Sequence, residues 1–414
     1  MDAAPLREAA VLIGGDGRIA AVGPAAAVPA PPDAEHLTFP SGLLLPGLVN
    51  THTHLELTGF APTASELDFR HWILSIRRLK QARSPAEFLA AARRGLQDCW
   101  EAGVTTIADT GDSGAAVEAL AALGGSGIAY HEVFGPHPEQ LEESVADLAQ
   151  RMDQLAPFQR GRVRLGVSPH AAYTVSGPLY ARVAALAREQ GLPIAVHVAE
   201  SAAETQLVVS GTGPFAEAWT ARGIPLLDDP RHFPAARSPA PPVRSPVAWL
   251  DAHGVLGPET LCIHAIRISA ADIRVLAERG VAIAHCPVSN AAHGHGAAPL
   301  AALRQAGIRV GIGTDSVASV GALDLLREAR AARALAGLDA AAALALATLE
   351  GARALGLEAE IGSLTVGKWA DLAVVVPAAG QDHREPLHAA LHASPADVVL
   401  TVLGGRIVHR AVPA

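Results

Sequence analysis

The sequence predicts an α/β protein, a (β/α)8 TIM-type barrel with a small β domain formed from both chain ends. Short apolar runs alternate with longer helical patterns between residue 47 and about residue 355. This alternation is typical of parallel strands joined by helices. Eight apolar runs occur there, and that number favours a closed barrel over an open sheet. No Gly-x-Gly-x-x-Gly pattern follows the first run, so a dinucleotide-binding fold is not favoured.

The predicted strands are short apolar segments, and the stretches between them carry apolar residues at helical spacing. The strands are Gly47–His52, Gly103–Ala108, Gly127–Phe134, Val163–Val167, Pro193–Val198, Thr260–His264, Val281–His285 and Arg309–Gly313. The clearest helical stretches are Pro85–Glu101, Glu139–Leu155, Pro178–Gln190 and Ala270–Arg279. We therefore expect the barrel to occupy residues 47–361.

The two chain ends have a different pattern, with short strands and tight turns. Near the N-terminus, Ala10–Ile13 and Arg18–Val22 flank a Gly-Asp-Gly turn, which is typical of a β-hairpin. We expect residues 1–46 and 362–414 to meet in one small β domain. The strands predicted near the C-terminus are Ile361–Leu364, Asp371–Val376, Asp397–Leu403 and Arg406–His409.

One segment interrupts the barrel pattern. Residues 227–246 are rich in proline, arginine and serine, which predicts a long surface loop. Long loops on a barrel often carry specificity. The alternative, a tolerated insertion without a role, stays open.

The composition excludes several classes of protein. The net charge is -9 and there is no basic run, which argues against a nucleic-acid partner. Three widely spaced cysteines cannot build a disulfide framework. The sequence has no apolar stretch of about 18 residues, so it predicts no membrane span. The first residues do not match a secretory signal. We therefore expect a protein of the cytoplasm.

Histidines at strand ends are the strongest chemical signal. His52 and His54 end the first predicted strand with one residue between them, so their side chains project to the same side. His197, His264 and Asp315 end three further strands. The carboxyl ends of barrel strands meet at one face, where barrel active sites lie. Several neutral imidazoles with one carboxylate suit Zn²⁺ or another divalent ion.

These motifs resemble the amidohydrolase superfamily over essentially the whole chain. The matching segments are Pro-Gly-Leu-Val-Asn-Thr-His-Thr-His at residues 46–54, His197-x-x-Glu200, His264 and Gly313-Thr314-Asp315-Ser316. The resemblance implies that the metal ligands are His52, His54, His197 and Asp315. Zn²⁺ is the preferred ion, and Fe²⁺, Ni²⁺ and Mn²⁺ are also compatible.

The number of metal ions follows from the lysines. Relatives with two ions bridge them with a carboxylated lysine on a middle strand, whereas Lys80 and Lys368 are the only lysines here and neither ends a predicted strand. We therefore predict one ion per chain. This pattern resembles the deaminase branch of the superfamily, in which Glu200 and His264 form the acid–base pair.

The chemistry implied by this resemblance is hydrolytic deamination. The cation would lower the pKa of bound water, and His264 could accept the water proton. Glu200 would protonate the ring nitrogen beside the carbon that carries the amine. Asp315 could relay a proton to the departing ammonia.

Finer motifs resemble the subfamily that deaminates 6-aminodeoxyfutalosine, an adenine nucleoside derivative of menaquinone biosynthesis. They are His-Thr-His-Leu-Glu-Leu-Thr at 52–58, His-Glu-Val-Phe-Gly-Pro at 131–136, Ser-Pro-His at 168–170, Gly-Pro-Phe at 213–215 and Ser-Pro-Val at 245–247. The expected partner is thus a small purine nucleoside, and the resemblance allows a homodimer.

The predicted substrate contacts rest on weaker signals. Related enzymes place a ribose-binding Glu before the tryptophan of the first loop, where this chain has His71 before Trp72. Glu56 is a candidate replacement, because a carboxylate accepts hydrogen bonds from both ribose hydroxyls. A benzoate at the far end of the substrate needs a cation, and arginine suits it best. The further candidate contacts are Trp72, His170, Ser316, Arg70, Arg77 and Arg78.

Several alternatives remain open at this point. The same machinery would serve methylthioadenosine or S-adenosylhomocysteine deamination, or hydrolysis of a ring halide or cyclic imine. A metal-binding barrel without catalysis belongs to a different class, and Glu200 together with His264 argues against it. His293 and His295 could be additional ligands, although loop histidines without a special role are the simpler interpretation.

Overall fold

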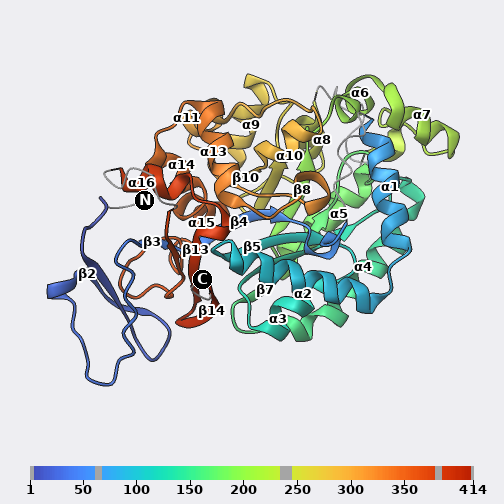
Figure 1. Cartoon of the computed structure of the whole chain (residues 1–414). Helices are drawn as coiled ribbons and strands as arrows, with labels where there is room; N and C mark the ends of the chain where they lie inside the picture. The colour runs from blue at the N-terminus through green and yellow to red at the C-terminus, as the bar shows by residue number, and fades with distance from the viewer. Residues whose placement is uncertain (1–3, 61–67, 234–244, 378–384, 412–414) are drawn as a thin grey trace.

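The computed structural model describes residues 4–60, 68–233, 245–377 and 385–411, and its central feature is one sheet of eight parallel strands. All eight strands predicted from the sequence are present, and each lies beside the next in chain order (Figure 1). The fold prediction is therefore confirmed. The strands are β4 Leu48–Thr53, β5 Val104–Gly111, β6 Gly127–Val133, β7 Val163–Pro169, β8 Ile194–Val198, β9 Thr260–His264, β10 Ala282–His285 and β11 Arg309–Ile312.

Hydrogen bonds between the first and last strands close the barrel. The Asp315 backbone N–H donates to the His52 carbonyl at 3.0 Å, just beyond the end of β11. One residue earlier in the chain, Thr314 makes two more contacts: the Asn50 amide donates to Thr314 Oγ1 at 2.8 Å and accepts from the Thr314 N–H at 3.1 Å. The carboxyl ends of β4 and β11 are thereby joined where the predicted metal ligands lie.

Helices cover the outside of the barrel. The stretches predicted at 85–101 and 270–279 form α2 and α9 with the expected bounds. The stretch predicted from Glu139 begins as an α-helix only at Leu141, as α4 Leu141–Leu155, because Pro138–Gln140 forms a 3-10 turn, η3. The other helices that follow barrel strands are α1 Phe69–Gln81, α3 Ala115–Leu123, α5 Gly177–Gln190, α6 Ala202–Ser210, α7 Gly213–Ala221, α8 Pro246–Ala252, α10 Pro287–Ala292, α11 Leu300–Gln305, α12 Val317–Val320, α13 Leu325–Ala336, α14 Ala340–Leu346 and α15 Leu349–Ala354.

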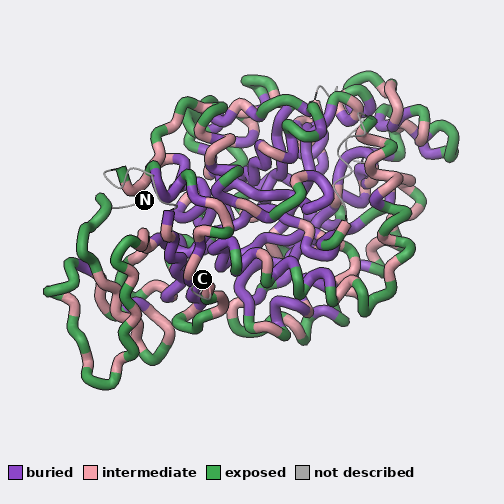
Figure 2. The backbone as a smooth tube through the Cα atoms, viewed as in Figure 1, coloured by how far each residue is buried: buried purple, intermediate pink, exposed green. Residues whose placement is uncertain are grey.

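Apolar side chains fill the barrel interior, among them the larger Ile128, Tyr130 and Leu261. On β8, Ala195 belongs to the buried cluster that also contains Val49, Ala108 and Ala284. The next residue, Val196, belongs to the cluster shared with the helices. Since side chains alternate along a strand, His197 faces the same side as Ala195, into the barrel mouth. Figure 2 shows the buried centre as a continuous purple region.

Both chain ends contribute to a separate antiparallel sheet. Its order is β14-β13-β12-β3, from Arg406–Arg410, Val398–Leu403, Leu372–Val375 and Leu43–Pro46. The predicted hairpin is also present, as β1 Ala9–Ile13 and β2 Ile19–Pro24, but it pairs as a two-stranded sheet of its own. Ile19 nevertheless packs in one apolar cluster with Leu372 and Leu400. The division at 46/47 and 361/362 stays a prediction.

One predicted strand near the C-terminus is wrong. Residues 361–363 form bends, and residue 364 has no regular structure, so no strand forms here. Gly362 has φ +86°, a left-handed conformation that ends extended pairing. A Cβ at this position would lie 2.7 Å from the Ala352 Cβ, so the chain passes too close to α15 for a side chain.

Two further sequence predictions concern the surface. No helix within the described ranges is long and apolar enough to cross a membrane. Of the predicted loop 227–246, residues 234–244 lie outside the described residues. The parts on either side form the 3-10 turn η5 Pro230–His232 and the first residue of α8.

Candidate metal centre and active site

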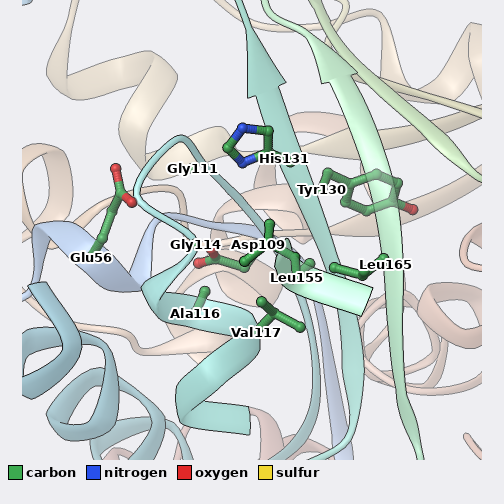
Figure 3. A pocket seen from close by; sticks show the side chains of 11 residues that line it. Glu56, Asp109, Gly111, Gly114, Ala116, Val117, Tyr130, His131, Leu155 and Leu165 are labelled. Atoms are coloured by element: carbon green, nitrogen blue, oxygen red, sulfur yellow. The ribbon is translucent and has the colours of Figure 1, made fainter. Parts of the chain in front are cut away.

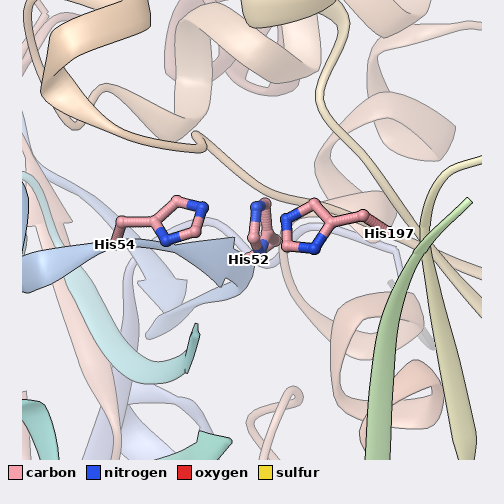
Figure 4. Close-up of side chains that lie close together, drawn as sticks. All are labelled: His52, His54 and His197. Atoms are coloured by element: carbon pink, nitrogen blue, oxygen red, sulfur yellow. The ribbon is translucent and has the colours of Figure 1, made fainter. Parts of the chain in front are cut away.

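Three histidines meet at the carboxyl ends of the barrel strands. His52 and His54 come from the end of β4, and His197 comes from β8 on the other side of the mouth. One ring nitrogen of each lies within 4.8 Å of the others. Figure 4 shows the three rings facing a common centre. Two strands far apart in sequence thus supply three nitrogen ligands to one point.

Asp315 completes this cluster from the end of β11. Its Oδ1 lies 3.5 Å from His54 Nε2 and 3.7 Å from His52 Nε2. His52, His264 and Asp315 form a second triplet of potential ligand atoms within 4.8 Å. The four residues proposed as ligands are therefore brought together, with His264 beside them.

The protonation states in this cluster suit a divalent cation. Neither ring nitrogen of His52 has a hydrogen-bond partner, although the residue is buried. Burial lowers the pKa of His52, His54 and His197, which keeps these imidazoles neutral. Burial alone would raise the pKa of Asp315, but contact with His52 holds it well below its usual range. Neutral imidazoles beside one carboxylate are a suitable donor set for such an ion.

Outer hydrogen bonds orient these side chains. His54 Nδ1 donates to the Thr110 carbonyl at 2.8 Å, which leaves Nε2 free toward the cluster. Ser289 Oγ donates to Asp315 Oδ2 at 2.6 Å, and the Ser316 N–H donates to Oδ1 at 2.7 Å. Such partners fix the orientation of ligands and tune their basicity.

Glu200 and His264 lie next to the cluster as a pair. Glu200 Oε1 is 3.6 Å from His264 Nε2 and 3.5 Å from His295 Nδ1. His264 Nδ1 donates to Asn290 Oδ1 at 3.0 Å, which directs Nε2 toward Glu200. Burial alone would raise the pKa of Glu200, but His264 and His295 lower it to about 2. The carboxyl is therefore ionised and can accept a proton.

The backbone is strained where these groups leave their strands. Ala199, His264, Ala265 and Asp315 all have φ between +46° and +71°, a region that non-glycine residues rarely adopt. Strain of this kind concentrates at functional sites. The buried Glu204 stabilises the first of these turns, because its carboxylate accepts from the Ala199 and Glu200 N–H groups at 2.9 Å each.

The predicted substrate contacts occupy different surroundings. His170 is half-buried, and its ring centroid lies 4.8 Å from that of His197. Ser316 is buried behind Asp315 and shares a 3.2 Å hydrogen bond with Ser319. Trp72 packs in an apolar cluster with Leu57. On α1, Arg70 is half-buried, whereas Arg77 and Arg78 are exposed.

The surroundings of Glu56 do not favour the predicted sugar contact. Its side chain is 2% exposed, and Oε1 accepts from Lys80 Nζ at 2.5 Å. Oε2 accepts from the Ser113 N–H and hydroxyl. Figure 3 shows Glu56 beside the Gly111 loop, next to a cavity of about 10 Å³, the size of one water. This contact pattern favours a structural role for Glu56.

Aromatic side chains form a wall beside the catalytic pair. The ring centroids of Phe69 and His295 lie 4.5 Å apart, and those of Trp72 and His293 lie 4.6 Å apart. His293 and His295 stack at 5.3 Å and are buried. From the sequence these two histidines could be additional ligands or ordinary loop residues, and the structure packs them against Phe69 and Trp72. We call the four residues Phe69, Trp72, His293 and His295 the aromatic wall.

A closed barrel with this histidine and aspartate cluster at its carboxyl face defines a metal-dependent hydrolase. The amidohydrolase family model matches residues 43–408, and the chain belongs to that family.

Individual relatives agree with this membership. The chain is 31% identical over 333 residues to the aminodeoxyfutalosine deaminase of Deinococcus radiodurans, covering 78% of this chain and 77% of the relative. It is 32% identical over 409 residues to the 5-methylthioadenosine/S-adenosylhomocysteine deaminase of Natronomonas pharaonis, covering 95% and 86%. The crystal structure of an adenosine deaminase from Xanthomonas campestris with bound zinc has a TM-score of 0.80 and 28% identity, covering 97% and 88%.

Proposed function

We propose that this chain is a metal-dependent deaminase that replaces the 6-amino group of an adenine nucleoside with oxygen and releases ammonia. The observation that carries the proposal is the Glu200–His264 pair, 3.6 Å apart, beside His52, His54, His197 and Asp315. A protein that only binds a metal needs no such pair. The adenosine deaminase relative carries zinc, which supports a single Zn²⁺ held by the three histidines and Asp315.

The chemistry can be assigned to particular atoms. When bound, the cation supplies positive charge that makes water acidic enough to react near neutral pH. His264 Nε2 accepts a proton from that water. The 3.6 Å separation lets the proton pass to the ionised Glu200, which delivers it to the ring nitrogen beside the reacting carbon.

Loss of the amine completes the reaction. Oxygen has added to the ring carbon at this stage, so the carbon–nitrogen bond to the amine must break. Asp315 takes the remaining proton from the added hydroxyl and gives it to the amine, which leaves as ammonia while the carbon–oxygen double bond forms. Ser289 and the Ser316 N–H hold the Asp315 carboxylate in place during this step.

We favour 6-aminodeoxyfutalosine as the substrate, which would place the enzyme in menaquinone biosynthesis. The similarity to the Deinococcus radiodurans enzyme supports this choice, as do the motifs at residues 52–58 and 131–136. The half-buried Arg70 on α1 offers a cation to the benzoate end of that molecule. The second candidate is methylthioadenosine or S-adenosylhomocysteine, which the longer match to the Natronomonas pharaonis enzyme favours.

An ammonia-release assay on the zinc-loaded full chain tests the proposal. The substrates are 6-aminodeoxyfutalosine, methylthioadenosine, S-adenosylhomocysteine and adenosine, and the Glu200→Gln variant controls for contaminating deaminases. We expect the highest kcat/KM with 6-aminodeoxyfutalosine. Equal or better turnover of methylthioadenosine would refute the menaquinone assignment and keep the deaminase, whereas no ammonia from any of the four would refute the deaminase.

A further inference from the structure

Glu132 is a carboxylate that the mechanism above does not use. It lies near the end of β6 and is 6% exposed. Among the residues that the structure describes, none donates a hydrogen bond to it, and Oε1 is buried without a partner. His170 Nε2 lies 3.9 Å from Oε1, beyond hydrogen-bond distance. Burying a carboxylate without hydrogen-bond donors costs free energy of folding. This cost indicates that Glu132 is placed to bind a group that is not part of the protein.

Other buried carboxylates of the barrel show what a purely structural role looks like. Glu56 accepts from Lys80 and Ser113. Asp109 accepts from the Leu55 N–H at 2.6 Å, and Glu204 accepts from two backbone N–H groups. Each of these three is satisfied by the protein itself. Glu132 differs from them because its donors must come from outside the described chain.

The position of Glu132 limits what those donors can be. Its carboxylate lies within 4.8 Å of the ring nitrogens of His170 and His197, and His197 belongs to the metal cluster. Glu132 therefore lies one side chain away from the reacting centre, on the β6–β7 side. In an adenine nucleoside the sugar is attached to the five-membered ring, on the far side of the base from the carbon that carries the amine. When that carbon lies at the metal cluster, the sugar therefore points away from the cluster.

We propose that Glu132, with His170 beside it, accepts hydrogen bonds from the 2′- and 3′-hydroxyls of the nucleoside sugar. Two neighbouring hydroxyls offer two donors, and one carboxylate can accept both. This inference rests on the proposed function, and it gives Glu132 the sugar contact that the sequence suggested for Glu56.

The test compares adenosine with 2′,3′-dideoxyadenosine on the full-length, zinc-loaded enzyme. Wild type should prefer adenosine in kcat/KM by roughly tenfold to hundredfold, the effect of a hydrogen bond to a charged group. Glu132→Gln should lose most of that preference, because its kcat/KM should fall for adenosine and stay unchanged for 2′,3′-dideoxyadenosine. Glu143→Gln, an exposed glutamate on α4, is the matched control and should behave as wild type.

Each other outcome overturns the inference. An equal fall for both nucleosides would make Glu132 structural, and a selective loss in Glu56→Gln would return the sugar contact to Glu56. Loss of a second metal equivalent in Glu132→Gln would make Glu132, His170 and His197 a cation site instead. No turnover of adenosine by wild type would also refute the sugar contact, while turnover of 6-aminodeoxyfutalosine in the same assay would keep the proposed function.

Discussion

Two parts of the barrel mouth are built differently. In the metal cluster, which we call the metal side, His54 and Asp315 leave strand ends and are each fixed by a hydrogen bond to a neighbouring segment. The aromatic wall, by contrast, comes from α1 and the segment after β10, and its rings pack mainly on one another. The strands thus fix the chemistry, whereas segments between strands shape the surface that the rest of the substrate meets.

The largest expected effect comes from breaking the metal side. His52→Ala should abolish metal binding, because this residue belongs to two of the three triplets of potential ligand atoms, the two that contain the proposed ligands His54 and Asp315. The lost charge stabilisation is worth several kcal/mol, so kcat/KM for every nucleoside should fall about a thousandfold or more. Metal content by elemental analysis and ammonia release should fall together.

An exposed histidine provides the control for that experiment. His36 lies on the surface before the barrel begins, so His36→Ala should keep one metal equivalent and full activity. Two equivalents in fully active wild type would contradict the prediction of one ion. Retained activity in metal-free His52→Ala would contradict the proposed ligands themselves.

Removing the acid–base pair should have a smaller effect and leave the metal in place. Glu200→Gln and His264→Asn should each keep one metal equivalent, because neither residue is among the four proposed ligands. Each should lose at least about a hundredfold in kcat, which is the usual contribution of such groups. Near-normal turnover in either variant would remove that residue from the mechanism and leave the metal assignment intact.

The metal side could be predicted from sequence because the barrel obeys a simple rule. A strand alternates its side chains, so the pattern of Ala195, Val196 and His197 already indicates a histidine facing the interior. The same rule applies to Glu132 near the end of β6, and the missed signal was the polar residue next to His131 in an otherwise apolar run.

Other contacts had no sequence signal. Ser289 reaches Asp315 across 26 residues, and Lys80 reaches Glu56 across 24. Both contacts depend on how a helix packs on the barrel, which no local pattern encodes. The burial of His293 and His295 likewise follows from contact with Phe69 on α1, so the sequence alone suggested ordinary loop histidines.

The smallest predicted effect tests the substrate side, through the arginines of α1. All four candidate nucleosides present the same reacting carbon, so the metal centre cannot distinguish them, and selectivity must come from remote binding energy. Arg70 is half-buried and follows Phe69 of the aromatic wall, whereas Arg77 and Arg78 are exposed. Arg70→Gln should therefore lower kcat/KM for 6-aminodeoxyfutalosine by roughly tenfold, the value of one charge-assisted contact. Adenosine, which lacks the benzoate, should be unaffected, and Arg78→Gln should change neither substrate. If Arg70→Gln lowered kcat/KM equally for both substrates, Arg70 would support the site without contacting the benzoate. The substrate assignment would then lose its cationic contact.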